Sequence, residues 1–541
     1  MKKTNLTLIA CLFIASLFAQ TTGRIENLKD GWGTAFTYVG EIKNKQANGL
    51  GVAIYSNKHA TRYAGYFLNN QFSGRGAIIF EDGTFLSGTW KNGKLTGKGA
   101  YLSKDGDLYL GEFNDGKKEG VGMYVYSDKS ILAGALKNDT YEGRCIFINA
   151  SGTTVADNIY TAGKKNGSGY QYDMNSKTLY EGTWADGTWS SSGTASYASF
   201  LKSDKFYSEK TTDQILMGGI DKNNKNLLQD TAFLYNLTNN NRYFGYYDNG
   251  FLKNGLIIRD STVFFGKVND EGAYGNCSLY KLKKYYDEGN YESDYLDGSN
   301  NLSLDLASKT VYFGATDKGN WTGKAWYVNG FNEIYNGNFD KGGFNGPGYI
   351  VYNTGKAIRG TYKNDVLTTL TSFTDENGAP IDLKPKSFEA ALNLVTSEFP
   401  NDFVVFKGVE DPDASVDDYL SARKSIINFP ASLGSNLLIE DYDFQIGYSA
   451  GFYKGSNFQA AKTQYDKLCR DIATSNIHVK SSTFPIKPTG IVEKATESNT
   501  TRTKFTLSDP GLENYSMYAE LGYKDGSYTV RLFAGDIKFD D

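Results

Sequence analysis

Glycine recurs along this chain with a period of about 23 residues, and this spacing constrains the fold more than any other feature. The leading glycines stand 25, 23, 23 and 23 residues apart, at Gly40, Gly65, Gly88, Gly111 and Gly134. Each has a companion nine residues later and a second small residue two further on, at Gly49/Gly51, Gly74/Gly76, Gly97/Gly99, Gly120/Gly122 and Gly143/Cys145. A fixed period of this length indicates a repeat array whose units pack on their neighbours.

The same frame returns in the second half of the chain. An aromatic or large aliphatic residue stands two positions before each leading glycine, first at Tyr38, Tyr63, Leu86, Tyr109 and Leu132. Later units have their leading glycine at Gly182, Gly245, Gly266, Gly289, Gly314, Gly337 and Gly360, with Asp157 and Gly219 as degenerate members. Fourteen candidate units therefore run from about residue 36 to residue 370.

Each unit has the pattern of a β-hairpin. A short alternating strand at residues 85–90 leads into the turn signal Lys91-Asn92-Gly93-Lys94, and a second strand follows at residues 99–102. Turns every ten or twelve residues, without helical periodicity, predict a long antiparallel meander. Because glycine weakens a strand interior, we expect an aromatic ring from the neighbouring hairpin to lie flat over each bare backbone.

Large side chains around the leading glycines predict a buried aromatic spine. Residues two before and two after each leading glycine share one face of the strand. They form the pairs Tyr38/Ile42, Tyr63/Phe67, Leu86/Trp90, Tyr109/Phe113, Tyr180/Trp184 and Tyr335/Phe339. The intervening positions are mixed, as in Val39/Glu41. Because soluble monomers rarely expose a continuous apolar face, we expect sheet twist, the longer second-half loops or another chain to cover the spine.

The order Tyr-x-Gly, Lys-Asn-Gly and Gly-x-Gly resembles the MORN (membrane occupation and recognition nexus) repeat family. The best matches are residues 63–83, 86–106 and 109–128, and the resemblance extends over roughly residues 36–370. It is specific in the first five units and looser between residues 150 and 300. The family implies hairpins stacked into an elongated, twisted sheet used for binding, scaffolding or membrane association, with no catalytic residues in the repeats.

The C-terminal segment has a different pattern. From about Pro385 the glycine period stops and helical periodicity begins. One helix is predicted from Phe388, Leu392, Val395 and Phe399, with Ser387 as cap and Pro400 as stop, and a second, starting at Ser456, from Phe458, Ala461, Tyr465, Leu468 and Ile472. Strands are predicted near residues 444–448, 504–507, 515–523 and 528–533, the last two joined by Lys524-Asp525-Gly526. These elements predict an α+β domain.

We therefore predict a mainly β protein with five segments. They are a signal peptide at residues 1–19, a lead-in at 20–35, the hairpin array at 36–370, a linker at 371–386 and the α+β domain at 387–541.

The first residues predict export. Met1-Lys2-Lys3 and the apolar run from Leu6 to Ala19 have the form of a secretory signal, too short for a membrane span, with cleavage after Ala19. A lipoprotein box ending at Cys11 is disfavoured because too little apolar sequence precedes it. No other segment is apolar enough to span a bilayer, so a periplasmic or extracellular protein is expected.

Composition excludes several kinds of partner. The net charge of −4 leaves no basic footprint for nucleic acid, and two histidines, His59 and His478, are too few for a multi-histidine metal site. We predict no metal and no cofactor. Three cysteines remain after cleavage, which is no disulfide framework. Cys145 and Cys277 share one repeat position and are interpreted as small fillers, and Cys469 as a core thiol.

Two motifs resemble catalytic signatures. Gly447-Tyr448-Ser449-Ala450-Gly451 spells a nucleophile elbow, which would require Ser449 on a strand-to-helix turn within reach of His478. The alternation of residues 444–452 favours a continuing strand instead. Two sequences, Gly88 to Lys94 and Gly111 to Lys117, resemble phosphate-binding loops but lack the Ser/Thr that would hold Mg²⁺, so they are interpreted as repeat turns.

Lysines recur in the hairpin turns. Stacked hairpins would align them along one rim, as candidate anion-binding residues Lys91, Lys94, Lys98, Lys117, Lys118, Lys164 and Lys165. The favoured hypothesis is a non-enzymatic exported binding or scaffold protein that contacts a protein or an envelope component, glycan or lipid included. The alternatives are docking to a membrane or anionic glycolipids, disfavoured by the acidic pI, and a hydrolase using Ser449.

Overall fold

The structure is a computed structural model. It describes residues 21–535 except 57–61, 191–198, 203–205, 221–227, 250, 260, 270–271, 282–283, 399–406, 411–420, 426–428, 434–435, 441–445, 480–481, 489–499, 508–511, 513–514 and 525. The predicted signal peptide and Pro400 lie outside the described residues. The chain divides into two compact units. Unit 1 comprises residues 1–343, 348–357 and 374–379, and unit 2 comprises residues 344–347, 358–373 and 380–541.

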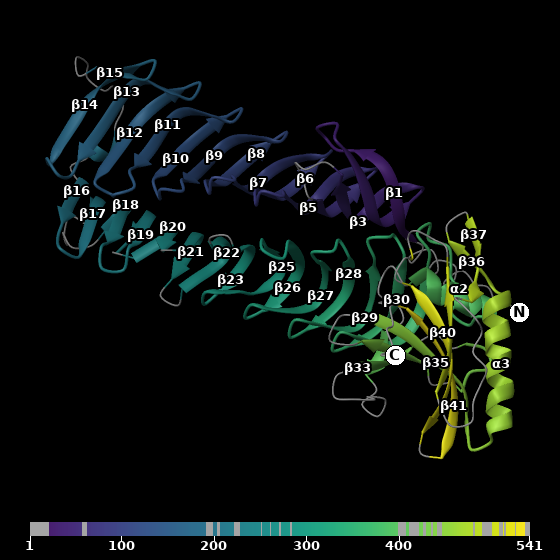
Figure 1. Cartoon of the computed structure of the whole chain (residues 1–541). Helices are drawn as coiled ribbons and strands as arrows, with labels where there is room; N and C mark the ends of the chain where they lie inside the picture. The colour runs from purple at the N-terminus through teal and green to yellow at the C-terminus, as the bar shows by residue number, and fades with distance from the viewer. Residues whose placement is uncertain are drawn as a thin grey trace, which may run out of the picture. The chain divides into compact units, whose positions relative to one another are not determined.

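The first half of the array forms one sheet of 15 strands in chain order (Figure 1). The strands are β1 (Thr21–Lys29), β2 (Ala35–Lys43), β3 (Gln46–Tyr55), β4 (Arg62–Leu68), β5 (Gln71–Ile79), β6 (Phe85–Lys91), β7 (Lys94–Leu102), β8 (Leu108–Asn114), β9 (Lys117–Val125), β10 (Ile131–Lys137), β11 (Thr140–Ile148), β12 (Thr154–Thr161), β13 (Lys164–Asp173), β14 (Thr178–Ala185) and β15 (Thr188–Ser190). A short 3-10 helix, Phe200–Lys202, follows.

A second sheet of 16 strands contains the later repeats, with β24 paired only to β23. Its strands are β16 (Phe206–Lys210), β17 (Gln214–Ile220), β18 (Leu228–Asn236), β19 (Asn241–Asp248), β20 (Phe251–Arg259), β21 (Thr262–Asn269), β22 (Gly272–Lys281), β23 (Tyr285–Glu292), β24 (Tyr295–Leu296), β25 (Gly298–Asp305), β26 (Thr310–Asp317), β27 (Asn320–Val328), β28 (Ile334–Asp340), β29 (Gly343–Val351), β30 (Ala357–Lys363) and β31 (Val366–Thr374). The predicted antiparallel hairpin architecture is confirmed.

The small residues of the repeats form one row across the first sheet. Gly40 pairs with Gly51, Gly51 with Gly65 and Gly65 with Gly76, and the row continues to Gly134 and Cys145. Two expected members are wrong by one residue. Cys145 pairs with Asn158 rather than Asp157, and Ala232 pairs with Gly218 rather than Gly219. In both places two adjacent residues are similar, Asp157 beside Asn158 and Gly218 beside Gly219. The sequence spacing alone therefore could not tell which of the two occupies the position of the leading glycine.

We expected the ring over each glycine to come from the neighbouring hairpin. This holds at Gly99, where Phe113 is the nearest ring, but in the repeats led by Tyr38 and Tyr109 the tyrosine belongs to the same hairpin as the glycine. A Cβ on Gly51 would lie 2.2 Å from Tyr38 Cε2, and one on Gly122 would lie 2.3 Å from the Tyr109 hydroxyl oxygen. Each ring therefore covers the small residue on the partner strand. The pairing shifts just after the leading glycine, as in a β-bulge. The Tyr109 hydroxyl donates to the Glu112 carbonyl at 3.0 Å, next to that bulge.

The predicted spine is buried in most repeats. Tyr38, Tyr63 and Tyr109 are fully buried, as are Trp90 and Phe113. The chain itself covers these side chains, because they pack on one another and on the neighbouring hairpins in a single cluster. Tyr180 contradicts the prediction, since 43% of it is exposed. It lies on β14, the next-to-last strand of the first sheet, where one three-residue strand follows.

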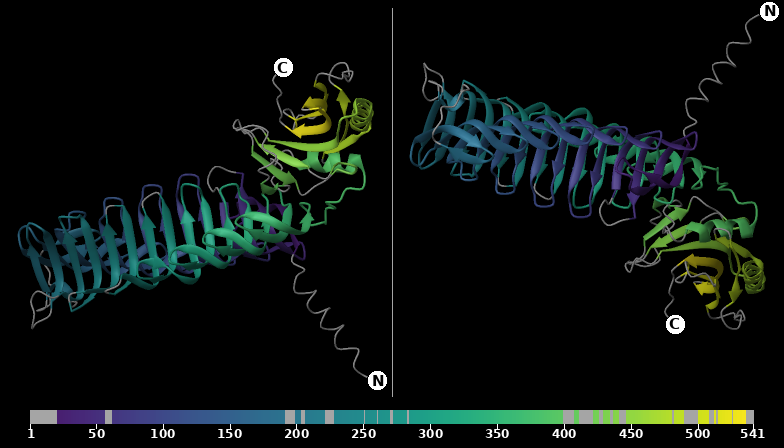
Figure 2. Two further views of the ribbon diagram at one scale, coloured as in Figure 1. Left: turned by 90° about the horizontal axis from the view of Figure 1, so that it is seen from below. Right: turned by 90° about the horizontal axis from the view of Figure 1, so that it is seen from above.

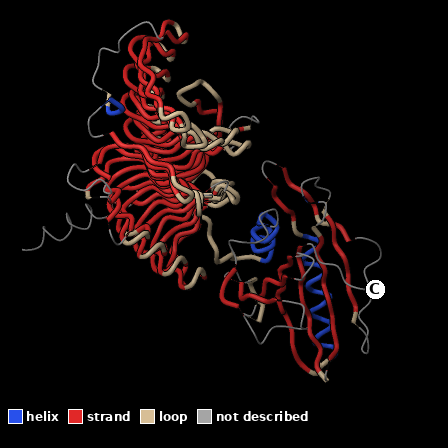
Figure 3. Tube along the Cα trace, turned by 90° about the vertical axis from the view of Figure 1, so that its left-hand side faces the viewer, coloured by secondary structure: helices blue, strands red, loops and turns tan. Residues whose placement is uncertain are grey.

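The array folds back on itself, which the prediction of one continuous sheet did not include. Figures 2 and 3 show the second sheet running alongside the first. The contacts agree with this course: Tyr172 on β13 contacts Ser208 on β16, whereas Arg75 on β5 contacts Glu288 on β23. A shared core fills the space between the sheets, with residues of both halves, including Val52, Ala100, Leu110, Tyr286, Leu302, Val311 and Val328.

The C-terminal segment contains an eight-stranded sheet in the order β32-β33-β34-β35-β41-β40-β39-β38 and a separate pair, β36 and β37. Its elements are α2 (Phe388–Glu398), β32 (Lys407–Glu410), β33 (Ser421–Ser425), β34 (Leu437–Glu440), β35 (Ile446–Gly455), α3 (Phe458–Thr474), β36 (Asn476–Val479), β37 (Ser482–Pro485), β38 (Lys487–Pro488), β39 (Thr501–Thr506), β40 (Ser516–Lys524) and β41 (Ser527–Gly535). The predicted α+β composition is confirmed.

Both predicted helices are present. Ser387 Oγ accepts from the Ala390 N–H at 3.1 Å, which confirms it as the cap of α2. The second helix begins two residues later than predicted, because Asn457 rather than Ser456 provides the N-cap. Its buried residues are Ala461, Tyr465, Leu468, Cys469 and Ile472, so the predicted apolar stripe faces the sheet.

The three described cysteines are expected to resist thiol reagents in the folded protein. All are free and buried, and burial raises the pKa of the Cys145 thiol to about 12. Because the thiolate is the reactive form, a maleimide should modify the native chain slowly and the urea-unfolded chain rapidly. Mass spectrometry after timed labelling would measure this, with Thr89→Cys as an exposed control. Rapid native labelling of Cys145 or Cys277 would contradict their burial.

Candidate functional site: a cavity between the two sheets

A partly open cavity of about 810 Å³ lies between the two sheets, within unit 1. Strands β5 to β10 provide one wall and β21 to β26 the other. The walls include the backbone of Gly99, Gly111, Gly122, Gly134 and Gly289. Side chains at Gly111 and Gly122 would point away from the cavity, because a Cβ on either would meet the Tyr109 hydroxyl in the spine.

The cavity forms because the residues before and after a leading glycine differ. Leu110, one residue before Gly111, is buried in the core between the sheets. Glu112, one residue after, shares this face of β8 but is exposed and lines the cavity. Apolar residues such as Leu110, Met123, Phe265 and Phe313 form part of the cavity wall, and polar side chains occupy the part nearer the hairpin turns.

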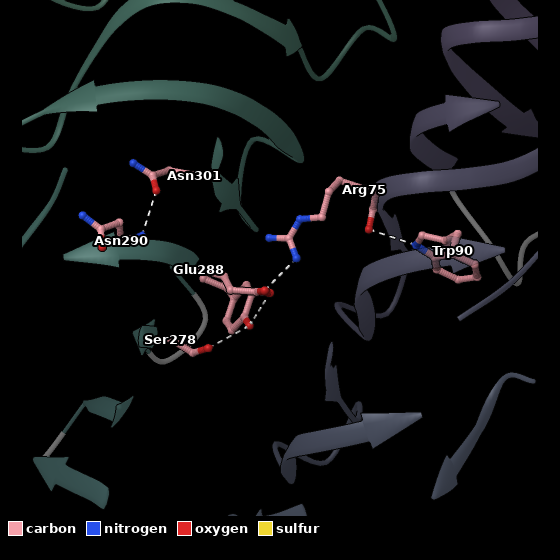
Figure 4. Close-up of polar contacts among 8 residues, drawn as sticks. Arg75, Trp90, Ser278, Glu288, Asn290 and Asn301 are labelled. Atoms are coloured by element: carbon pink, nitrogen blue, oxygen red, sulfur yellow. Dashed lines mark hydrogen bonds and ion pairs between the residues drawn. The ribbon is translucent and has the colours of Figure 1, made fainter. Parts of the chain in front are cut away.

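An ion pair among the cavity residues joins the two sheets (Figure 4). Arg75 Nη1 lies 2.7 Å from Glu288 Oε1, and both side chains are mostly buried. The Tyr286 hydroxyl lies 3.1 Å from Glu288 Oε2 and 3.3 Å from Ser278 Oγ. The guanidinium of Arg75 also stands 6.0 Å from the centre of the Phe313 ring. Glu288 is therefore held by groups from both sheets.

Four other polar side chains of the cavity have no side-chain partner among the residues that the structure describes. Lys98 and Glu112 stand opposite each other on β7 and β8, yet within the described part of the chain they form no ion pair. Thr89 and Asn276 likewise have no side-chain hydrogen bond among the described residues. All four are exposed. These groups are available to a ligand without breaking an existing contact.

Asp287 lies beside Glu288 but points to the opposite face of β23. Burial raises the pKa of its carboxyl from 3.8 to about 6, opposed by a hydrogen bond from Ser303. The folded chain thus binds this proton more tightly than the unfolded chain. Its contribution to stability is complete below about pH 4 and is lost as the pH rises through about 6.

We therefore expect Asp287→Asn to stabilise the protein at pH 7.5 and not at pH 4. The raised pKa corresponds to about 3 kcal/mol of unfolding free energy at pH values above 6. Urea unfolding at the two pH values would measure it, with Asp317→Asn at an exposed strand end as control. An equal effect of Asp287→Asn at both pH values would show that ionisation is not the cause.

Three of the seven lysines of the predicted rim are paired with carboxylates. Lys94 contacts Asp115 at 2.6 Å, Lys164 contacts Asp186 at 2.6 Å, and Lys118 lies 3.9 Å from Asp139. Each pair joins one hairpin turn to the next. Lys91 and Lys117 are exposed, and Lys117 Nζ stands 3.5 Å from Asn138 Oδ1. Anion binding by these residues stays a prediction.

Two of the seven lysines cover aromatic rings. Lys118 Nζ stands 4.5 Å from the centre of the Tyr101 ring, and Lys165 Nζ stands 4.4 Å from that of Trp184. Burial lowers the pKa of both lysines. Of the predicted rim, only Lys98 lines the cavity.

The hydrolase hypothesis fails its geometric requirement. Ser449 lies inside β35, paired with Leu437 on one side and Phe533 on the other, and it is buried. The helix α3 begins only at Phe458, so Ser449 is not on a strand-to-helix turn. The phosphate-loop resemblance is also a hairpin turn, because Asn92 and Gly93 both have positive φ between the paired Lys91 and Lys94.

Sequence reasoning missed the polar residues of the cavity, apart from Lys98, although it identified the repeat glycines of the walls. Arg75, Glu288 and Asn276 are single polar residues in ordinary strands, and no motif marks them. Within the described residues, no group of three His, Cys, Asp or Glu could hold a metal ion. No helix in that part of the chain is both long and apolar enough to cross a membrane.

Comparison with known proteins agrees with this architecture. The MORN repeat family model matches four consecutive segments, at residues 38–59, 63–85, 87–108 and 109–131. No curated protein matches the chain. The matched segments coincide with the hairpins from β2 to β9, and the row of small residues continues beyond them. The chain therefore contains MORN repeats at residues 38–131.

Proposed function

We propose that this chain is an exported, non-enzymatic binding protein whose array is the scaffold and whose ligand lies in the cavity between the sheets. MORN repeats are associated with binding and scaffold roles, which supports the first part. The observation that carries the site is the set of unpartnered polar side chains, Thr89, Lys98, Glu112 and Asn276, around an 810 Å³ space. Ligand cavities are typically of this size, with an apolar lining and a few polar groups.

Binding is tested with two lysine variants on neighbouring strands. Lys98→Glu reverses a charge in the cavity, and Lys91→Glu makes the same change at an exposed site outside it. Immobilised wild type and Lys91→Glu should retain the same component of a cell-envelope extract, identified by mass spectrometry of bound glycans, lipids and proteins. Lys98→Glu should lose it. Equal retention by both variants, or none by wild type, would refute the cavity as the site.

Export is supported by the charged start and apolar run of residues 1–19. Expression of the full sequence in a bacterial host should yield a cell-envelope or secreted product that begins at Gln20. N-terminal mass spectrometry of each fraction would measure this. Recovery of the intact chain from the cytoplasm alone would contradict export.

A further inference from the structure

We propose that the cavity binds an uncharged glycan segment, an inference that rests on the binding function above and specifies its ligand. The chemistry of the lining residues, taken wall by wall, favours a neutral molecule rich in hydroxyl groups.

The charge of the lining is balanced. Two cationic residues, Arg75 and Lys98, face two anionic residues, Glu112 and Glu288. Arg75 and Glu288 already neutralise each other at 2.7 Å. The remaining lysine and glutamate are opposed in register, so a ligand with one net charge would attract one and repel the other. A neutral ligand with donors and acceptors can satisfy both.

The available groups favour hydroxyls as partners. Lys98 only donates, the Glu112 carboxylate only accepts, and Thr89 and Asn276 do both. A hydroxyl group can donate to one of these and accept from another. Adjacent hydroxyls on a sugar ring therefore match a wall where donors and acceptors alternate over short distances, as Lys98 and Glu112 do across one strand pair.

The backbone of the walls disfavours an extended peptide. Strands that bind peptides by edge pairing offer a row of free N–H and C=O groups. Strand β7 is paired to β6 and β8, and β22 is paired to β21 and β23. Both walls are thus sheet faces, and a peptide backbone would find no main-chain partners. Side-chain recognition of hydroxyls has no such requirement.

The apolar part of the wall suits the C–H face of a sugar ring. Leu110, Met123 and Phe265 line the cavity. A ring can therefore pack on these apolar side chains while its hydroxyls point toward the polar residues. Val121, 70% exposed, extends this apolar surface.

The test measures binding of labelled oligosaccharides by fluorescence titration. Short neutral hexose oligosaccharides, acidic oligosaccharides, peptides and anionic vesicles are the probes. Thr89→Val and Asn276→Leu each remove hydrogen-bonding groups from the cavity and should weaken neutral glycan binding about tenfold. Thr183→Val is the matched control, because Thr183 follows Gly182 as Thr89 follows Gly88 but does not line the cavity. It should bind like wild type.

The outcomes separate the two proposals. Neutral glycan binding that depends on Thr89 and Asn276, with unchanged melting temperatures, supports the glycan assignment. The protein could instead bind acidic glycans, peptides or vesicles, with binding that is lost in Lys98→Glu. This result would overturn the assignment of a neutral glycan and leave the proposed binding function intact. If no probe and no extract component distinguishes Lys98→Glu from Lys91→Glu, both proposals fail.

Discussion

Replacing Trp90 with alanine is expected to lower the free energy of unfolding by about 3–5 kcal/mol. Only 1% of the side chain is exposed. Its ring meets Tyr63 edge-on at 5.5 Å and Phe72 at 5.6 Å, and Nε1 donates to the Gly76 carbonyl at 3.0 Å. The substitution leaves a large cavity in the spine and removes the hydrogen bond to the Gly76 carbonyl, and both effects destabilise the fold.

Urea unfolding followed by circular dichroism would measure this loss, with Tyr180→Ala as control. Tyr180 occupies a spine position by sequence, but 43% of it is exposed, so its removal should change stability by less than about 1 kcal/mol. Equal unfolding midpoints for Trp90→Ala and the wild type would show that the spine does not hold the array together.

The second large effect is expected from a single methyl group. In Gly51→Ala the new Cβ would lie 2.2 Å from Tyr38 Cε2, closer than any real contact. The backbone at Gly51 itself has no unusual φ, so the cost is purely steric. Because Tyr38 is completely buried, its ring cannot simply move away, and we expect a loss of about 3 kcal/mol.

A double-mutant cycle tests the cause. In a Tyr38→Leu background the ring is absent, so Gly51→Ala should cost much less there than in the wild type. Gly451→Ala is the control, because the nearest atom to its Cβ would be 3.9 Å away. If Gly51→Ala is equally destabilising in both backgrounds, the ring over the glycine is not the reason for the repeat's small residues.

The repeat itself could be predicted from sequence because its signal is local. Tyr38, Gly40 and Gly51 act within one hairpin, and their spacing fixes that hairpin's bulge and ring contact. The one-residue errors at Asn158 and Gly218 have the same origin, since only hydrogen-bond register decides which of two neighbours enters the row.

The fold-back could not be predicted because the strand face that meets the second sheet is only partly apolar. Val39 and Leu110 precede their leading glycines and are buried, whereas Glu41 and Glu112 follow and are polar, so this face appeared mixed. In the structure the apolar half forms the core between the sheets and the polar half opens into the cavity. The cavity depends on which strands face each other, and Arg75 meets Glu288 from 213 residues away.

That long separation affects how the chain reaches its native state. Hairpins close between near neighbours, but Glu41 meets Tyr349 only after 308 further residues exist. At about 5–20 residues per second, the half that contains Arg75 waits on the order of 10–40 s for Glu288 to be synthesised. Until then the second sheet does not yet cover the side chains of Val52, Ala100 and Leu110. We therefore expect the early repeats to be prone to aggregation until the second sheet covers this surface.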